Sequence, residues 1–423
     1  MLQTTFIREN KELVIERLKK RNFNANKHIN KIIKLDDERK ATQQKLDENL
    51  AESNKLAKQI GEFYKLGKQE EANQLKENTA KLKEISNVLK EEQNKISNEL
   101  NKILYQVPNV PNETVPAGKS AEDNETVFES GSISKLNDKA LPHWELAKKY
   151  NIIDFDLGVK VTGAGFPFYI GKGARLQRAL INFFLDEARD AGYTEIIPPL
   201  MVNEASGKGT GQLPDKEGQM YRVKKDKFYL IPTAEVPLTN MYRDVIVKKE
   251  DFPIKVTGYT PCFRREAGSY GKDVRGLNRL HQFDKVEIVQ IQHPDKSYAT
   301  LDTMVEHVKG LLQKLELPYR VLKLCGGDLG FTSALTYDME VFSAAQAKWL
   351  EVSSISNFET FQANRLKCRF KDENGKMQLV HTLNGSALAL PRILAALLEN
   401  NQTIEGIKIP KALVAYTGFD IIK

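Results

Sequence analysis

The sequence predicts an α+β protein in which a long helical hairpin precedes an antiparallel β-sheet flanked by helices. Three features of the 423-residue chain support this prediction. A proline-free stretch, residues 27–105, has the Lys, Glu, Gln and Leu content typical of long helices. A segment rich in proline, glycine and asparagine follows it. After that segment, strand patterns outnumber the helices that could connect parallel strands. We therefore expect a hairpin at 1–105, a linker or crossover at 106–135 and a sheet domain at 136–423.

Two apolar series predict the helical hairpin. The second series recurs every seven positions and consists of Leu75, Leu82, Leu89, Ile96 and Ile103. The first series, between Leu35 and Phe63, is less regular. Because Leu66-Gly67-Lys68 interrupts the pattern, the two series favour one antiparallel pair of helices with facing apolar seams. A coiled coil between two copies of the chain fits the composition equally well.

Helices and strands alternate beyond the linker. A helix is expected from Leu176 until Gly192 stops it, and a strand from Tyr193 to Ile197. Two longer strands, at 257–266 and 280–291, are joined by a glycine-containing loop and predict a long antiparallel hairpin. Short strands are then expected at 339–344, 350–354 and 366–370, followed by a closing helix at 386–399.

Composition excludes several classes of protein. The longest informative apolar run has six residues, far short of the roughly 20 that a membrane helix needs, so neither a membrane protein nor a membrane partner is expected. Charged residues among the first twenty argue against a secretory leader, so we expect a cytoplasmic protein. Cys262, Cys325 and Cys368 are odd in number and far apart, which favours free thiols over disulfides or zinc. The net charge of +7, densest in the first hundred residues, weakly indicates a polyanionic partner.

Polar residues of the long strands suit a nucleoside triphosphate. No phosphate loop or dinucleotide fingerprint is present, so a nucleotide must be bound in another way. Arg264 and Glu266 share one face with Cys262 on the first strand. On the second strand, Phe283, Lys285 and Glu287 share one face. If these faces coincide, the sheet combines a guanidinium, carboxylates and an aromatic ring, which fits phosphates and a base. A solvent-facing strand with ion pairs is the simpler interpretation.

Three other segments carry polar groups among apolar neighbours. The stretch 231–236 places Thr233 and Glu235 where they could hold a substrate ammonium, or simply in an exposed turn. The stretch 351–354 offers carboxylate and hydroxyl oxygens that could bind Mg²⁺. Arg392 lies in an apolar helix pattern, where its guanidinium either reaches water or meets an anion. His381 is interpreted as structural.

Taken together, these segments resemble the seryl-tRNA synthetases, a class II aminoacyl-tRNA synthetase family, over essentially the whole chain. The matching stretches are 107–113, 209–214, 233–235, 263–269, 281–287, 351–354 and 381–386. The resemblance implies a class II catalytic domain behind a coiled-coil arm that binds tRNA. It makes 195–199 the first family motif, at a homodimer interface, 263–287 the second and 385–392 the third.

The resemblance also implies roles for individual residues. Arg264 and Arg392 would be catalytic: Arg264 would contact the ATP α-phosphate and the reacting carboxylate, and Arg392 the γ-phosphate and one face of the base. Phe283 would cover the other face, and Glu266 would bind the adenine amino group. The implied ATP residues are Arg264, Arg265, Glu266, Phe283, Glu351, Val352, Ser353, Ser354 and Arg392. The implied serine residues are Thr233, Ala234, Glu235, Glu287, Asn384 and Ser386, with Thr382 nearby. Glu351 and Ser354 would bind Mg²⁺.

The implied activity is serine–tRNA ligation. Serine and ATP form seryl-adenylate, and the seryl group passes to tRNA(Ser) or, in hosts that make it, to tRNA(Sec), as the first step of selenocysteinyl-tRNA synthesis. DNA is not an expected partner. Four positions depart from the family pattern: Pro391 where glycine is common, Phe342 where tryptophan is usual, Ile355 for cysteine and Asn364 for arginine. An amino-acid ligase that charges a carrier protein and a non-enzymatic coiled-coil adaptor are the competing interpretations.

Overall fold

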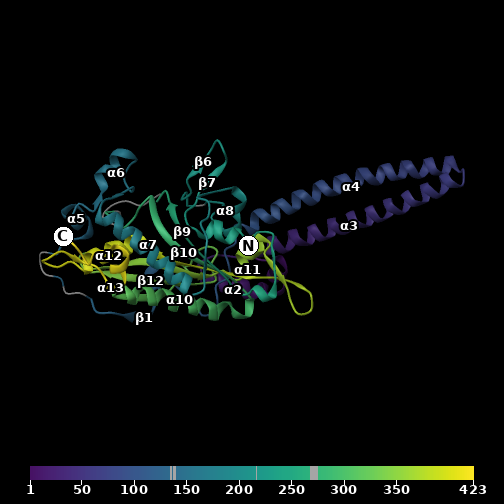
Figure 1. The fold of residues 1–423 in the computed structure, drawn as a ribbon. Coiled ribbons are helices and arrows are strands. Elements are labelled where there is room, and N and C mark those ends of the chain that lie inside the picture. Colours follow the sequence, from purple (N-terminus) through teal and green to yellow (C-terminus); the bar gives the residue numbers. More distant parts are fainter. Residues whose placement is uncertain (134–135, 137–139, 216, 267–274) are drawn as a thin grey trace. The chain divides into compact units, whose positions relative to one another are not determined.

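The computed structural model describes the whole chain except residues 134–135, 137–139, 216 and 267–274. The described residues form two compact units, one of residues 1–19 and 23–108, the other of residues 20–22 and 109–423 (Figure 1). Residues 20–22 belong to the second unit, to which the Arg21 side chain is hydrogen-bonded. Its guanidinium donates to the carbonyl oxygens of Leu329, Gly330 and Ser333 at 2.7–3.0 Å.

The first unit is helical. Short helices α1 (Thr4–Glu9) and α2 (Lys11–Lys19) precede the long helices α3 (Asn26–Lys65) and α4 (Gln69–Leu104), which pair along their length (Figure 1). The chain reverses at Gly67, whose φ of 72° suits glycine. Asn49 Nδ2 donates to Leu82 O and to Ser86 Oγ, each at 2.7 Å, and so fixes the register of the pair. The prediction of an intrachain antiparallel hairpin is confirmed.

One buried carboxylate joins α1 to α3. Asp36 is 1% exposed and forms ion pairs with Arg8 (3.1 Å), Arg39 (2.8 Å) and Lys40 (3.0 Å). Burial alone raises the pKa of Asp36, but hydrogen bonds from Arg39, Lys40 and Arg8 outweigh burial and hold it below its ordinary value. The ionised carboxylate therefore stabilises the base of the hairpin.

The second unit contains an eight-stranded sheet. Its strands, in spatial order, are β1 (Glu125–Ser130), β11 (Tyr319–Lys323), β12 (Leu335–Ser343), β13 (Lys348–Asn357), β16 (His381–Ala389), β10 (Gln282–Gln292), β9 (Ile254–Phe263) and β4 (Thr194–Glu195). Every neighbouring pair is antiparallel except β4 with β9. The predicted antiparallel sheet is confirmed, as is the long hairpin made by β9 and β10.

Helices cover one face of this sheet. The apolar side chains of α7 (Lys172–Asp190), α10 (Ser297–Lys314) and α12 (Leu390–Asn400) form a single core with alternate residues of the strands. On β16, Leu383 and Ala387 enter this core, while Thr382, Asn384 and Ser386 have the opposite parity. The strands therefore present an apolar face to the helices and a polar face to the other side.

Shorter elements complete the unit. The remaining helices are α5 (His143–Lys149), α6 (Phe155–Val161), α8 (Glu204–Thr210), α9 (Glu235–Asn240), α11 (Thr360–Leu366) and α13 (Lys411–Thr417). One-turn 3₁₀ helices are Ala121–Asp123, Lys249–Asp251 and Pro294–Lys296. One small three-stranded sheet has the order β5 (Met201–Val202), β7 (Phe228–Leu230) and β6 (Arg222–Val223). Another has the order β15 (Met377–Leu379), β14 (Arg369–Lys371) and β8 (Ile246–Val247). Two-stranded pairs are β2 (Ile153–Asp154) with β3 (Phe168–Tyr169) and β17 (Ile407–Lys408) with β18 (Ile421–Ile422).

Several predicted boundaries were wrong. The closing helix begins at Leu390, not at residue 386, because β16 continues to Ala389. Pro391 is consequently the second residue of α12, where a helix does not need the amide that proline lacks, so this departure does not disturb the helix. Residues 366–370 are not one strand: α11 ends at Leu366 and β14 begins at Arg369. β9 ends at Phe263, so Arg264 and Glu266 lie beyond the strand.

Two predictions from composition can be compared with the fold. Cys262, Cys325 and Cys368 are free thiols, as predicted, and the structure shows that all three are buried. Within the described part of the chain, no helix combines the length and the hydrophobicity that crossing a bilayer requires.

We predict that Asp36→Asn lowers the free energy of unfolding of the hairpin unit by about 2 kcal/mol at pH 7, because it removes hydrogen bonds to a buried charged group. Since the folded pKa is depressed, this contribution is present above the ordinary pKa of aspartate and is lost as pH falls through the folded value. Urea unfolding followed by circular dichroism at pH 7 and pH 3 measures both effects. Asp37→Asn is the control, because Asp37 is mostly exposed. Equal stability of both variants at pH 7 would contradict the prediction.

Candidate active site

The predicted site residues gather on the polar face of β10, β13 and β16. In the pairing of β10 with β16, Glu287 lies opposite Ser386, and Ser386 Oγ is 3.5 Å from Glu287 Oε2. Ser353 Oγ of β13 donates to Ser386 O at 2.5 Å. Asn384 lies two residues before Ser386 on the same face and is 8% exposed. Strand pairing thus brings together residues from three distant parts of the sequence.

A buried ion pair lies at the centre of this face. Glu287, 1% exposed, pairs with Lys285 Nζ from the same strand. Lys285 Nζ also donates to Thr233 Oγ1 at 2.9 Å, and Thr233 Oγ1 accepts the amide N–H of Glu235 at 3.1 Å. Ala234 does not face the site, because its side chain packs with Leu238 in a small apolar cluster. The segment before α9 is therefore held against β10 by Lys285.

Glu235 is a second buried carboxylate beside Glu287. It is 7% exposed; its Oε1 accepts from Gln362 Nε2 at 2.7 Å and its Oε2 from Gln212 Nε2 at 3.4 Å. Gln362 in turn accepts from Thr382 Oγ1 at 2.7 Å. Burial, and then the charge of Glu287, raise the pKa of Glu235 to about 7, although Gln362, Lys285 and Arg264 oppose the shift. Glu235 is therefore poised to favour an incoming cation that would restore its charge.

Arg264 and Phe283 lie together despite the end of β9. The Arg264 guanidinium carbon is 5.2 Å from the centre of the Phe283 ring, and Arg264 Nε donates to Pro232 O at 3.3 Å. Glu266 Oε2 forms an ion pair with Arg279 at 3.0 Å. Arg265 is exposed, and its backbone N–H donates to Gln219 O. A planar guanidinium beside a ring and a carboxylate can recognise a heteroaromatic base and its phosphates.

Arg392, on the first turn of α12, contacts the edge of β13. Its Nη1 donates to Glu351 O at 2.8 Å and lies 3.6 Å from Glu351 Oε2, while its Nε donates to Asn278 O at 3.1 Å. The side chain is 27% exposed, so the guanidinium is neither free in water nor fully buried. Backbone carbonyls hold it in place and leave part of it available to an anion.

Acidic oxygens collect near the predicted metal residues. Ser354 of β13 is paired with Asp338 of β12, and Glu351 is half exposed. Burial, followed by the charge of Glu351, raises the pKa of Asp338 well above its ordinary value, although Ser354 hydrogen-bonds it. Asp338 Oδ1 is buried without a hydrogen-bond partner among the described residues. Carboxylate and hydroxyl oxygens are the ligands that Mg²⁺ prefers, so this donor set fits a divalent cation.

Two predicted ATP residues do not present side chains to the site. Val352 is 1% exposed and belongs to the apolar core, and the Ser353 hydroxyl is used by Ser386 O. The sequence analysis placed Lys285 on the same strand face as Phe283 and Glu287 but assigned it no role, and it missed Gln362 and Asp338. Gln362 and Asp338 have no local signal, because their importance comes from contacts with residues far away in the chain.

Comparison with known proteins gives one consistent result. Residues 1–111 match the family described as the seryl-tRNA synthetase N-terminal domain, and residues 220–401 match the tRNA synthetase class II core domain (G, H, P, S and T). A serine–tRNA ligase of Salinibacter ruber is 50% identical over 421 residues, which cover 99% of this chain and 98% of the relative. A serine–tRNA ligase of Chlorobium luteolum is 45% identical over 427 residues, covering 100% and 99% of the two chains.

Solved structures agree with these relatives. The crystal structure of seryl-tRNA synthetase from Pyrococcus horikoshii complexed with ATP has a TM-score of 0.91 and 35% identity, and the match covers 100% of this chain and 99% of that one. A Giardia lamblia prolyl-tRNA synthetase in complex with prolyl-adenylate has a TM-score of 0.56 at 15% identity, covering 64% and 54% of the chains. This second likeness concerns the fold alone.

The raised pKa of Glu235 predicts a pH-dependent gain in stability for Glu235→Gln. A carboxyl whose folded pKa is raised from 4.5 to about 7 destabilises the fold as it ionises, so the cost is absent below pH 4.5 and complete above pH 7. In the absence of ligands, Glu235→Gln should therefore be more stable than wild type by about 1–3 kcal/mol at pH 8 and nearly equal at pH 4.5. Denaturant unfolding at both pH values, with the exposed Glu250→Gln as control, measures this difference. A loss of stability at pH 8 would contradict the prediction.

Proposed function

The chain belongs to the seryl-tRNA synthetase family of class II aminoacyl-tRNA synthetases, and we propose that it activates L-serine with ATP and transfers the seryl group to tRNA(Ser). The observation that carries this proposal is the pairing of Glu287 with Ser386 beside Glu235 and Lys285, a compact cluster of polar and charged groups suited to a small zwitterion. Arg264, Phe283 and Arg392 provide the neighbouring nucleotide side.

The serine end follows from the two buried carboxylates. Glu235 faces the position that the substrate ammonium takes, and binding that cation lets Glu235 ionise fully. Glu287, Ser386 and Thr233 surround the serine hydroxyl. Alanine is rejected because these buried polar groups would be left without partners, a loss worth about 1–3 kcal/mol for each group. Arg264 binds the serine carboxylate and the α-phosphate together.

The first chemical step is an in-line displacement. A serine carboxylate oxygen attacks the α-phosphorus, and the bond to pyrophosphate breaks. A ribose hydroxyl of the terminal tRNA adenosine then attacks the carbonyl carbon of seryl-adenylate and releases AMP. No protein nucleophile is required, because catalysis comes from positioning two anionic reactants and neutralising the growing charge. Arg264 and Arg392 perform this work, while Phe283 and Glu266 orient the base.

We propose Glu351 and Ser354 as Mg²⁺ ligands. The unpartnered Asp338 oxygen and the raised pKa of Asp338 support the proposal, since they indicate a buried carboxyl group whose ionisation a bound cation would favour. The ion would supply neutralisation of the phosphate charge when ATP is bound.

The helical hairpin is proposed to recognise the tRNA. We assign residues 1–105 to this arm, 106–135 to a linker and 136–423 to catalysis. Exposed lysines such as Lys55, Lys58, Lys81 and Lys83 lie along α3 and α4, and a rigid rod of this kind selects RNA by shape and backbone contacts. The same surface would accept tRNA(Sec) where the host makes it. We further propose a homodimer through residues 195–199, acting in the cytoplasm.

Serine-dependent exchange between ATP and labelled pyrophosphate tests the activation step. Wild type should exchange with serine and not with alanine. Arg264→Ala should lower the exchange rate about 10²–10³-fold, the typical cost of removing a donor to the transition state, while changing serine affinity less than tenfold. Arg369→Ala, an exposed arginine of β14, is the matched control. An adaptor protein would show no exchange, and equal losses of rate and serine affinity would contradict the assigned role of Arg264.

Shortening the hairpin tests the role of the arm. Because Asn49 contacts Leu82 and Ser86 across the pair, residues 50–81 can be replaced by a Gly-Ser turn that leaves the base of the hairpin paired. We expect this variant to keep serine-dependent pyrophosphate exchange within about twofold of wild type and to lose seryl transfer to tRNA(Ser). Substituting Lys55, Lys58, Lys81 and Lys83 by Gln at full length should reduce transfer and the salt dependence of tRNA binding. Transfer by the shortened variant at the wild-type rate would reject the assignment.

A further inference from the structure

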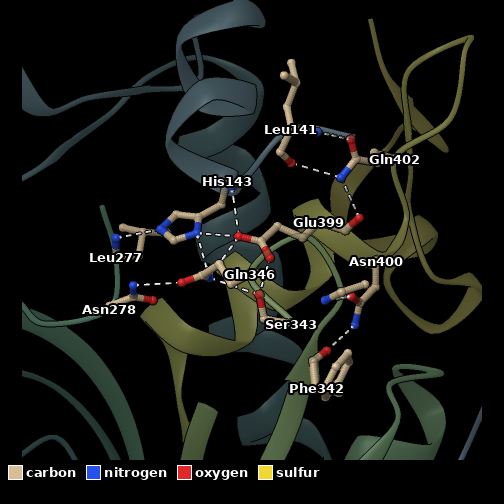
Figure 2. Close-up of polar contacts among 11 residues, drawn as sticks. Leu141, His143, Leu277, Asn278, Phe342, Ser343, Gln346, Glu399, Asn400 and Gln402 are labelled. Atoms are coloured by element: carbon tan, nitrogen blue, oxygen red, sulfur yellow. Dashed lines mark hydrogen bonds and ion pairs between the residues drawn. The ribbon is translucent and has the colours of Figure 1, made fainter. Parts of the chain in front are cut away.

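A fully buried histidine–carboxylate pair lies behind the nucleotide side of the site. His143, at the start of α5, and Glu399, near the end of α12, are both 0% exposed, and His143 Nδ1 is 2.7 Å from Glu399 Oε1 (Figure 2). No role in binding or chemistry has been assigned to either residue above. Burying a carboxylate costs several kcal/mol unless it is well paired, so the arrangement calls for a physical reason.

The hydrogen bonds determine the state of the imidazole. His143 Nε2 accepts the backbone N–H of Leu277 at 2.8 Å, so Nε2 carries no proton and Nδ1–H donates to Glu399. Glu399 also accepts the His143 backbone N–H at 2.9 Å and the hydroxyl of Ser343. Burial raises the pKa of Glu399, but hydrogen bonds from His143 and Ser343 outweigh it, and the net pKa lies below the ordinary value. The neutral imidazole thus links an ionised glutamate to the Leu277 amide.

Gln346 makes a second link from the same carboxylate. Its Nε2 donates to Glu399 Oε1 at 2.9 Å and to Ser343 Oγ at 3.0 Å, and its Oε1 accepts Asn278 Nδ2 at 3.0 Å (Figure 2). Two successive residues are therefore held: Leu277 by its backbone N–H, which His143 accepts, and Asn278 by its side-chain N–H, which Gln346 accepts. Both links end on Glu399.

The segment held in this way contacts the nucleotide residues. Asn278 O accepts from Arg392 Nε at 3.1 Å, and Arg279 pairs with Glu266 at 3.0 Å. The chain passes directly over the imidazole: Gly276 has a φ of 67°, and a Cβ added there would lie 2.3 Å from His143 Nε2. Only glycine permits this approach. The position of the Asn278 carbonyl therefore depends on His143, Gln346 and Glu399. The direction of the Arg392 guanidinium depends in turn on that carbonyl.

We propose that His143, Gln346 and Glu399 are positioning residues that set the Arg392 guanidinium for ATP through Leu277 and Asn278. This inference rests on the proposed function, because it assigns the cluster to the same nucleotide site. None of the three residues has been placed in contact with substrate. Their loss should therefore affect ATP more than serine.

Two substitutions of His143 separate its two hydrogen bonds. His143→Gln places an amide group near the position of Nε2 and can still accept the Leu277 N–H, whereas His143→Asn places its amide near Nδ1 and keeps only the bond to Glu399. In pyrophosphate exchange, we expect His143→Asn to raise the KM for ATP about five- to tenfold. The KM for serine should stay within twofold of wild type. His143→Gln should keep the KM for ATP within about twofold.

Gln346→Met provides an independent test. The variant is expected to fold, because Gln346 is only partly buried and methionine has a similar volume. It removes the Asn278 link while leaving His143 in place, and it too should raise the KM for ATP selectively. Thermal unfolding and calorimetric titration of ATP are measured on every variant. Lower melting temperatures with unchanged KM for ATP, or parallel rises in the KM for serine and ATP, would overturn the inference. Absence of exchange in the wild-type protein would instead reject the proposed function, while calorimetric ATP binding would still test the positioning role.

Discussion

The pairing of β10 with β16 is the constraint on which the site depends. Successive residues of a strand point to opposite faces, so this register sends Ile288, Leu383 and Ala387 into the helix-covered core and leaves Glu287 and Ser386 on the other side. A slip of one residue would drive Lys285 and Glu287 into the apolar layer. The large cost of burying those charges among hydrocarbon side chains therefore selects the register that also assembles the site. Folding and function share one requirement here.

The cations on the polar face do not fully compensate its buried carboxylates. Glu235 and Glu287 lie near Lys285 and Arg264, and burial still raises the pKa of Glu235 to about 7. A small cation beside Glu235 would remove this cost, whereas a neutral ligand of the same size would not. In the proposed serine site, discrimination would then have two physical sources: charge compensation at Glu235 and hydrogen bonds of the serine hydroxyl with Glu287 and Ser386.

Local patterns predicted much of the fold, and contacts between distant segments account for what they missed. Heptad spacing and the Gly67 break predicted the hairpin, because each long helix buries its apolar seam against the helix next to it in the chain. The stretch 386–389 was expected to be helical, yet pairing with β10 keeps it extended, since tertiary pairing overrides local propensity. Strand parity singled out Arg264, Phe283 and Glu287, and the family resemblance then implied their roles. Gln362 and Asp338 were missed, because neither their residue type nor their spacing indicates which distant groups lie beside them.

Helix α12 connects the two ends of the nucleotide side. Arg392 and Glu399 are seven residues apart, two helical turns and about 10 Å, and so lie on the same side of α12. Burial disfavours the charged form of Glu399, and the dipole at a helix C-terminus adds to this cost, so Glu399 needs donors from His143, Ser343 and Gln346. Those donors come from α5, from β12 and from the turn after it, so the unfavourable placement of Glu399 ties three segments to one rigid helix. The same helix presents Arg392 to the Asn278 carbonyl, and His143 and Gln346 hold that segment through the Leu277 amide and the Asn278 side chain. The guanidinium is thus oriented from both sides by a closed set of contacts, and this preorganisation is what a site that stabilises charge in a transition state requires.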